Sequence, residues 1–298
     1  MSATTLVKAQ ALDRDLLRRF VIPEHDGAND KDDRGRILVI GGSRAIPGGA
    51  LLAATGALRA GAGKLQIATV DSIAVPLAIA MPEALVAGHA EGEDGGFHDA
   101  AIPLLNDRCN SVDAVVIGPG MRDGPVVEQL LAAVLARGPA MPLVVDAAAL
   151  AASPANDAGF KAWRGGAVML PHIGEMAALL EIDTDEVDAD REGAAKRAAV
   201  RYGAVTLMKG PTSTIVAPDG ETFVYPGGGI GLGTSGSGDT LAGIVGGLLA
   251  RGMDPLGATL WGVWLHGEAG RRLAQAQGPV GFLAREIPPL IPGLLDGR

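Results

Sequence analysis

Short apolar runs alternate with helical patterns along most of this chain, and this alternation restricts the possible folds more than any other feature. The runs are about five residues long and carry few polar residues, which is typical of strands buried on both faces. We therefore predict an α/β fold, a three-layer sandwich with a mostly parallel central sheet and helices on both faces. The apolar runs lie at 36–40, 64–70, 114–118, 142–146, 167–171 and 204–209, and the helical patterns at about 47–61, 123–137, 147–152, 173–181 and 186–202.

The pattern changes after Lys209. Two short runs flank the turn sequence PDG (218–220), so we expect an antiparallel hairpin at the edge of the sheet. A glycine-rich loop and two long helical patterns, about 239–251 and 255–277, follow the hairpin. The Asp254-Pro255 pair is typical of a helix cap followed by proline in the first helical position.

Composition limits the size class and the partners. Of the 298 residues, 48% are hydrophobic and only 3% aromatic, so Ala, Val, Leu and Ile must fill a sizeable core. With no linker or repeat, we expect an N-terminal segment (1–30) and one domain (31–298). The formal net charge of -9 argues against nucleic acid and anionic membranes as partners. Cys109 is the only cysteine, and no long apolar stretch suggests a signal peptide or a membrane span, so we expect a cytoplasmic protein.

Several predicted strands end in residues that are typical of ligand sites. Ligands of open parallel sheets bind beside the carboxyl ends of the strands. We therefore predict one crevice lined by Gly42, Gly120, Asp146, His172, Lys209 and Asp239. Each residue also has a purely structural explanation: the glycines suit tight turns, Asp146 suits a helix cap, His172 a satisfied polar group, and Lys209 a partly exposed strand end.

The sequence GLGTSGSGDTLAGIVGGLLARG (231–252) raises the most specific chemical question. Four glycines in eight residues need a local reason, because glycine weakens both strands and helices. They would let the N–H groups of Gly236, Ser237 and Gly238 form an anion hole at the start of a helix. Asp239 comes next, either as a helix cap or as a base that takes a proton from a substrate hydroxyl.

Other chemistries fit the sequence less well. The P-loop motif is missing, and the match of GLGTSG to a dinucleotide-binding fingerprint follows a hairpin instead of opening a βαβ unit. Neither a zinc-ligand pattern nor the serine-hydrolase motif is present. The residues therefore favour phosphoryl transfer to a hydroxyl without a P-loop.

The glycine-rich loop with its aspartate resembles the G-[ST]-G-D signature of the ribokinase-like superfamily. Further segments, in order, resemble the ADP- or ATP-dependent NAD(P)H-hydrate dehydratases, the YjeF C-terminal domain type that is often labelled as carbohydrate kinases. These segments are GRILVIGGSRAIPGGALLAATGALRAGAGKL, VVIGPGM, LVVDAAAL, MLPHIGEMAALL, LMKGPTSTIVAPDG and WGVWLHGEAG, and together the resemblance covers about residues 30–292. It implies a hydro-lyase that repairs hydrated NADH and NADPH: ADP or ATP phosphorylates the hydrate hydroxyl, and loss of phosphate restores the nicotinamide ring.

The resemblance also implies roles for individual residues. Asp239 matches the catalytic aspartate, and Gly238 matches the anion-hole glycine that contacts the nucleotide. Contacts to the hydrated dinucleotide are implied for Gly49, Gly120, His172 and Asp239. The nucleotide-binding segment would be Lys209, Gly210, Pro211, Thr212 and Ser213.

Magnesium is expected as a cofactor, because nucleotide phosphoryl transfer requires a divalent ion that offsets the phosphate charge. The sequence has no dense carboxylate cluster and no direct metal ligand that we can name. We therefore expect the phosphates and water to hold the ion, with Asp146 or Glu175 contacting it through water.

The chain departs from the family pattern at four places. Ile173 stands where H-P-G-E has proline, Gly229 where G-N has asparagine, Ser235 where G-G-[ST]-G-D has its first glycine, and Gly49 where alanine is common. Two other functions stay open: a small-molecule kinase of the hydroxyethylthiazole or hydroxymethylpyrimidine type on the same fold, and, because of these departures, a non-catalytic nucleotide-binding protein. The resemblance further implies a homo-oligomer, a tetramer, and a separate NAD(P)H-hydrate epimerase in the same pathway, since about 30 leading residues cannot encode one.

Overall fold

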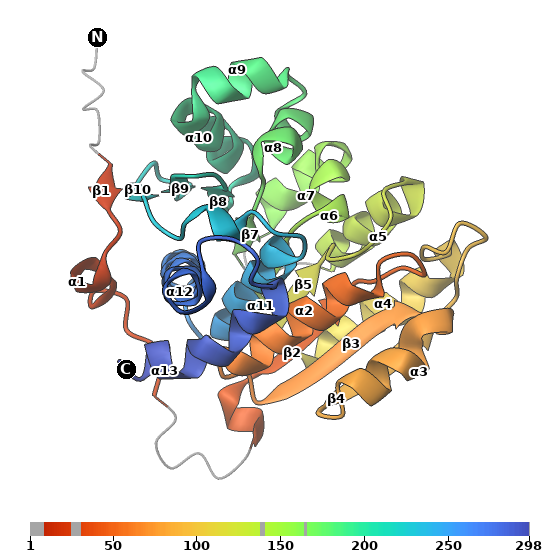
Figure 1. Cartoon of the computed structure of the whole chain (residues 1–298). Coiled ribbons are helices and arrows are strands. Elements are labelled where there is room, and N and C mark those ends of the chain that lie inside the picture. The colour runs from red at the N-terminus through yellow and green to blue at the C-terminus, as the bar shows by residue number, and fades with distance from the viewer. Residues whose placement is uncertain (1–8, 25–30, 138–140, 164–165, 298) are drawn as a thin grey trace.

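Helices cover both faces of one mixed sheet in the computed structural model, which describes residues 9–24, 31–137, 141–163 and 166–297. Within these ranges the sheet has ten strands in the order β1-β10-β9-β8-β7-β6-β5-β2-β3-β4 (Figure 1). The strands are β1 (Gln10–Ala11), β2 (Arg36–Ile40), β3 (Lys64–Val70), β4 (Ala84–His89), β5 (Ala114–Ile117), β6 (Leu143–Val145), β7 (Ala167–Met169), β8 (Val205–Met208), β9 (Ser213–Val216) and β10 (Thr222–Tyr225).

The strands from β8 to β4 in this order pair in parallel, and the core strands are buried along their whole length, as continuous apolar runs predict. One helical layer contains α2, α3, α11 and α12, and the other contains α4, α5, α7, α8 and α10 (Figure 1). The helices are α1 (Arg14–Leu17), α2 (Pro47–Arg59), α3 (Asp71–Ala80), α4 (Ile102–Arg108), α5 (Pro125–Ala136), α6 (Ala148–Ala151), α7 (Asp157–Ala162), α8 (Ile173–Leu180), α9 (Thr184–Ala189), α10 (Arg191–Tyr202), α11 (Ser237–Ala250), α12 (Pro255–Gln277) and α13 (Ile291–Leu295).

Helices α2 and α11 cross with their backbones in contact. A Cβ atom on Gly243 would clash with the carbonyl oxygen of Ala53, and one on Gly247 would clash with that of Ala57. Gly56 of α2 faces the carbonyl oxygen of Thr240 in the same way. Each glycine lowers the stability of its helix by about 0.5–1 kcal/mol relative to alanine. In return the two helices approach closely, and this contact fixes the start of α11 next to the start of α2.

The predicted α/β class, the parallel sheet and the cap at Asp254 are confirmed; the Asp254 side chain accepts a hydrogen bond of 2.9 Å from the N–H of Gly257. The β9–β10 hairpin is antiparallel and lies at its predicted end of the sheet, but β1 pairs outside it. The N-terminal segment thus contributes a strand, and parts of it, residues 1–8 and 25–30, lie outside the described ranges.

One prediction of local structure was wrong, and some elements were not predicted. Among the unpredicted elements are α3 and β4, at the far end of the sheet. The single helix expected at 186–202 is two helices, α9 and α10, because Asp190 leaves the helical conformation between them with φ -147° and ψ 72°.

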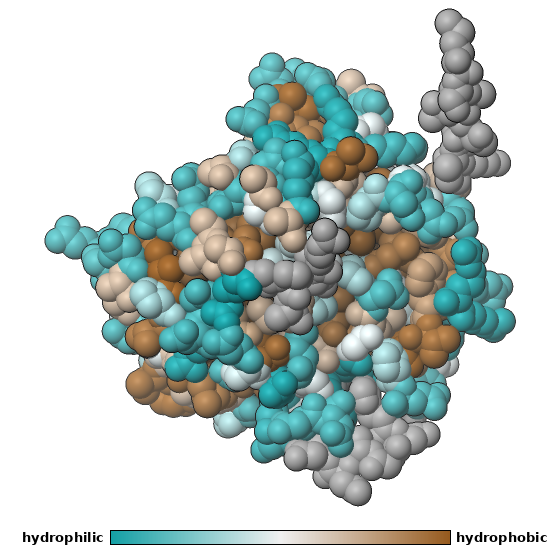
Figure 2. Space-filling model, turned by 180° about the vertical axis from the view of Figure 1, so that it is seen from behind, coloured by the Kyte–Doolittle hydropathy of each residue, from teal (hydrophilic) through white to brown (hydrophobic). Residues whose placement is uncertain are grey.

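Exposed apolar side chains gather on α3 and the neighbouring edge strand β4, seen at the lower left of Figure 2. Val75 is 68% exposed, Ile79 78% and Leu85 55%. By contrast, α11 is buried along nearly its whole length between the sheet, α2 and α12. Of the described helices, none has the length and the apolar character that crossing a membrane requires.

Candidate functional site

Five neighbouring parallel strands, β2, β5, β6, β7 and β8, end at the same edge of the sheet. The glycines and charged residues that we predicted for the site follow the ends of these strands. The sheet topology therefore brings the predicted site residues to one edge. The two loops nearest β2 contact each other directly: the N–H of Gly42 donates to the carbonyl oxygen of Pro119 over 2.8 Å.

Glycines of the β5 loop and of the first turn of α2 are needed for packing; Gly49 lies in this helix and not in a loop. Gly120 has a φ of +67°, which glycine adopts without strain. A Cβ atom on Gly49 would lie 2.5 Å from the backbone nitrogen of Gly120, and one on Gly120 would clash with the carbonyl oxygen of Ile46. The structural explanation of the glycines therefore holds, and it leaves bare backbone at this end of the site. That Gly49 and Gly120 contact a substrate stays a prediction.

A cluster of ion pairs around one buried carboxylate lies beside these loops. The Nζ atom of Lys209, at the end of β8, lies 2.8 Å from Oδ1 of Asp146 and 3.4 Å from Oε2 of Glu175. Asp146 is 2% exposed. Burial opposes the charge of Lys209, but the two carboxylates outweigh it and raise the pKa of the ammonium group. Lys209 is thus a fixed cation and not a side chain that extends freely into solvent.

Asp239 shares this environment. Burial and the nearby charges of Asp146 and Glu175 together raise the pKa of its carboxyl to about 6, and Lys209 opposes this rise. Asp239 is the third residue of α11, whose N-cap is Gly236, and no side chain caps this helix. The interpretation of Asp239 as a helix cap is therefore wrong. A carboxylate with a pKa near 6 suits a general base at neutral pH.

The start of α11 has free backbone donors. The N–H groups of Gly236, Gly238 and Asp239 form no hydrogen bond with any residue of the described ranges. The N–H of Ser237 already donates to the carbonyl oxygen of Thr234 over 3.2 Å, so it does not contribute a free donor. Gly238 lies close to the cluster, since a Cβ atom there would be 3.4 Å from Nζ of Lys209. Free N–H groups at a helix N-terminus attract anions.

His172 begins α8 at the same edge and has a capping role that the sequence did not reveal. Its Nδ1 atom accepts the N–H groups of Gly174 (3.0 Å) and Glu175 (3.2 Å), while the N–H of His172 donates to Glu175 Oε2 over 2.8 Å. Because Nδ1 is an acceptor, Nε2 carries the proton of the neutral ring. The half-exposed imidazole can therefore donate a hydrogen bond to a ligand through Nε2.

The segment from Lys209 to Ser213 leads from this cluster to the surface. Gly210, Pro211 and Thr212 are exposed. The guanidinium group of Arg191, at the start of α10, lies over Gly210 and is held by Asp188 at 2.6 Å. No motif in the sequence marked Arg191, which looked like one of several surface charges on a helix.

His266 is the second residue that the sequence reasoning missed. It lies in α12, and its Nε2 atom is 3.0 Å from the hydroxyl oxygen of Ser237. Burial lowers the pKa of its imidazole to about 4, against the opposing effect of its bond to Ser237. The only signal was the segment WGVWLHGEAG, in which one histidine interrupts an apolar helix.

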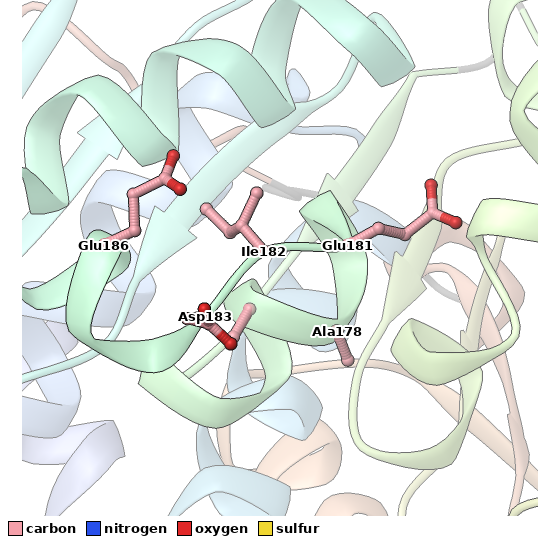
Figure 3. A pocket seen from close by; sticks show the side chains of 6 residues that line it. Ala178, Glu181, Ile182, Asp183 and Glu186 are labelled. Carbon is pink, nitrogen blue, oxygen red and sulfur yellow. The ribbon is translucent and has the colours of Figure 1, made fainter.

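A separate hollow of about 550 Å³ opens at the other end of α8 (Figure 3). It is lined by Ala177, Ala178, Glu181, Ile182, Asp183 and Glu186. Its three carboxylates repel phosphate groups, and α8 separates it from His172 by about 12 Å at 1.5 Å per residue. No group of three or more potential metal ligands is found in the described ranges. This hollow does not fit an anionic ligand, and the free donors of α11 do.

Comparison with known proteins adds independent findings. A family model described as NAD(P)H-hydrate dehydratase matches residues 37–292. The ADP-dependent (S)-NAD(P)H-hydrate dehydratase of Xanthomonas campestris is 46% identical over 283 residues, which are 94% of each chain.

Two further relatives extend the comparison. The bifunctional NAD(P)H-hydrate repair enzyme Nnr of Moorella thermoacetica is 35% identical over 97% of this chain, and the match spans 55% of that longer protein. Among solved structures, the ADP/ATP-dependent NAD(P)H-hydrate dehydratase of Bacillus subtilis, co-crystallised with ATP/Mg²⁺, superposes with a TM-score of 0.82. Its identity is 28%, and the match covers 97% of this chain and 99% of that one.

Proposed function

The chain belongs to the NAD(P)H-hydrate dehydratase family, and we propose that it dehydrates hydrated NADH and NADPH with ADP or ATP as the phosphoryl donor. One observation carries this proposal: Asp239, with a pKa near 6, stands among the free N–H groups of α11 and next to the Lys209 cluster. A base and an anion site are thereby joined at one helix end, as phosphoryl transfer to a hydroxyl requires.

We assign a separate step of the reaction to each group at the start of α11. The N–H groups of Gly238 and Asp239 receive the transferred phosphoryl group, whose negative charge the helix dipole also stabilises. The Asp239 carboxylate takes the proton of the hydrate hydroxyl while the hydroxyl oxygen attacks the terminal phosphorus of the nucleotide, and the nucleotide leaves with one phosphate fewer. The phosphorylated hydrate then loses phosphate from one ring carbon and a proton from the neighbouring carbon, and the double bond that forms restores the reduced nicotinamide ring.

The remaining contacts follow the same edge of the sheet. We assign the hydrated dinucleotide to the first turn of α2 at Gly49, to the loop of Gly120 and to Nε2 of His172. The nucleotide is assigned to residues 209–213 with Gly238, and Arg191 supplies a second cation beside this segment.

The donor set is compatible with magnesium held mainly by phosphate oxygens and water. Asp146 and Glu175 are hard oxygen ligands, but both already pair with Lys209. They would reach the ion through water, and the ion would offset phosphate charge during transfer. Full activity in excess chelator would contradict this assignment.

The test is to incubate the protein with hydrated NADH, magnesium and either nucleotide while following the absorbance of the reduced ring. Return of the NADH absorbance together with inorganic phosphate supports the dehydratase. A stable phosphorylated product would instead identify a kinase, and nucleotide binding without turnover of any hydroxyl substrate would identify a binding protein.

We further propose a cytoplasmic homo-oligomer, a tetramer, that works beside a separate NAD(P)H-hydrate epimerase. The exposed apolar surface of α3 and β4 supports association, because large apolar patches are unusual on monomers. Light scattering of the purified protein measures the state, and a monomeric Ile79→Glu variant would locate the interface there.

A further inference from the structure

The start of α11 is held from outside by a residue of α12. The Nε2 atom of His266 lies 3.0 Å from the hydroxyl oxygen of Ser237 and 3.1 Å from its carbonyl oxygen. A carbonyl oxygen only accepts hydrogen bonds, so Nε2 carries the proton and donates it. His266 is 8% exposed, which keeps water from replacing this bond.

The first turn of α11 needs such an external support. Its N-cap, Gly236, has a φ of +84°, and no side chain caps the helix. Gly236 and Gly238 flank Ser237, and glycine backbones are the least restricted. Ser237, between them, is the residue that His266 binds, so one contact fixes the middle of the glycine-rich turn.

The chemistry of the support suits an anion site. Burial keeps the imidazole neutral at neutral pH, with its pKa lowered to about 4. A neutral donor stabilises the turn without adding a charge beside the transferred phosphoryl group. It also leaves the N–H groups of Gly238 and Asp239 free, which a conventional side-chain cap would occupy.

We propose that His266 is a positioning residue for phosphoryl transfer: by bonding Ser237 it fixes the free N–H groups of Gly238 and Asp239, and the Asp239 carboxylate, in the reactive geometry. This inference rests on the proposed function. It predicts that loss of the bond lowers kcat and leaves nucleotide affinity nearly unchanged, because the nucleotide has further contacts outside this turn.

The test compares two polar variants that differ in reach. In His266→Gln the side-chain amide nitrogen comes near the position of Nε2, whereas His266→Asn is too short to bond Ser237. We expect the Asn variant to lose roughly 10- to 100-fold in kcat with little change in KM for ADP, as small misplacements do. The Gln variant should recover most of this loss. Equal kcat for wild type and the Asn variant would overturn the inference.

His89→Asn is the matched control. His89 is also buried, at 4% exposure, but within the described ranges neither of its ring nitrogens has a hydrogen-bond partner. The same substitution there should leave kcat unchanged. If His266→Asn does not fold, Ser237→Ala removes the hydroxyl acceptor alone and should lower kcat by a smaller factor; a wild-type kcat in that variant would count against the inference.

An activity-independent measurement separates this inference from the proposed function. The amide NMR signals of Gly238 and Asp239 should shift or broaden in His266→Asn, and should stay in place in His89→Asn. Unmoved signals would overturn the positioning role even if wild type is an active dehydratase. If wild type does not turn over hydrated NADH, the function fails, while the amide signals still decide whether His266 fixes the turn.

Discussion

Two helices, α8 and α11, begin at the same edge of the sheet, and their first turns are built in opposite ways. The first turn of α8 is satisfied by a capping box in which His172 and Glu175 bond each other's backbone. The first turn of α11 begins at a glycine, has no side-chain cap, and keeps free N–H groups. A satisfied helix start positions a side chain, whereas an unsatisfied one is itself a binding group. The contrast explains why glycine precedes one helix and histidine the other.

The largest effect is expected from Asp239→Asn, which removes the base from the unsatisfied turn. Turnover should fall by on the order of 10² to 10⁴, the usual contribution of a positioned base. Because the fold disfavours the ionised carboxylate, the variant should be more stable at neutral pH by on the order of 1–3 kcal/mol. Rate and melting temperature measured together check both effects; near-wild-type turnover would remove Asp239 from the mechanism.

A smaller loss is expected from Gly238→Ala, which narrows the same turn without damaging the fold. The added methyl group would stand 3.4 Å from Nζ of Lys209, in the space assigned to phosphate. Turnover should fall by on the order of 10²-fold, comparable with the loss of one oxyanion donor. Stability should rise by up to about 1 kcal/mol, since alanine favours helix over glycine.

Gly293→Ala is the control for this variant, because a Cβ atom on Gly293 of α13 meets open space. It should bring a similar gain in melting temperature and no loss of turnover. An active Gly238→Ala enzyme would show that the anion binds elsewhere.

The dependence of kcat/KM on pH tests the role of Asp239 as a base without any substitution. With a pKa of about 6, Asp239 loses its ionised form as pH falls, so kcat/KM should drop about tenfold per unit below that value. The contribution of Asp239 to the free energy of unfolding changes with pH in the opposite direction to the rate. The folded pKa lies above the ordinary value of 3.8, so the stability that this group contributes is present below pH 3.8 and is lost as pH rises through about 6. A rate profile that is flat from pH 5 to pH 8 would contradict this assignment.

The smallest effects are expected at the capped helix. His172→Ala removes two hydrogen bonds to the first turn of α8 and should cost about 1 kcal/mol of unfolding free energy. Asparagine is a good N-cap, so His172→Asn should restore the stability but not the Nε2 donor. If KM for the hydrate rises in both variants, the imidazole contacts substrate; if it rises in neither, His172 is only a cap.

The sequence predicted best what depends on local pattern. Apolar runs identified the parallel strands, and their special terminal residues identified the edge where Asp146, Lys209 and Asp239 meet. It failed at α3, where Pro76 lies inside the helix, and at β4, whose six residues ALVAGH end in glycine and histidine and form no continuous apolar run.

Tertiary contacts account for the residues that were missed. His266 bonds Ser237 from another helix, and Arg191 reaches Gly210 from α10, so neither relation leaves a pattern in the local sequence. The same applies to β1, whose two residues form a strand only because β10 offers them an edge. The capping role of His172 depends on the backbone geometry before α8, which residue spacing alone does not specify.

The backbone crossing of α2 and α11 has a consequence for how such a site can diversify. Since Gly56, Gly243 and Gly247 leave no room for a side chain, the two helices form one body, and any shift of one start carries the other with it. The first turn of α2, which contains Gly49, and the first turn of α11, which contains Asp239, therefore cannot change position independently. Substitutions that adapt the site to a new ligand should accumulate in loops that are not fastened to this pair, such as the one around Gly229 and Ile230, where the side chain is 77% exposed. The crossing therefore preserves the relative position of the catalytic turn and of α2 as the sequence changes, so ligand specificity should change mainly through the outer loops.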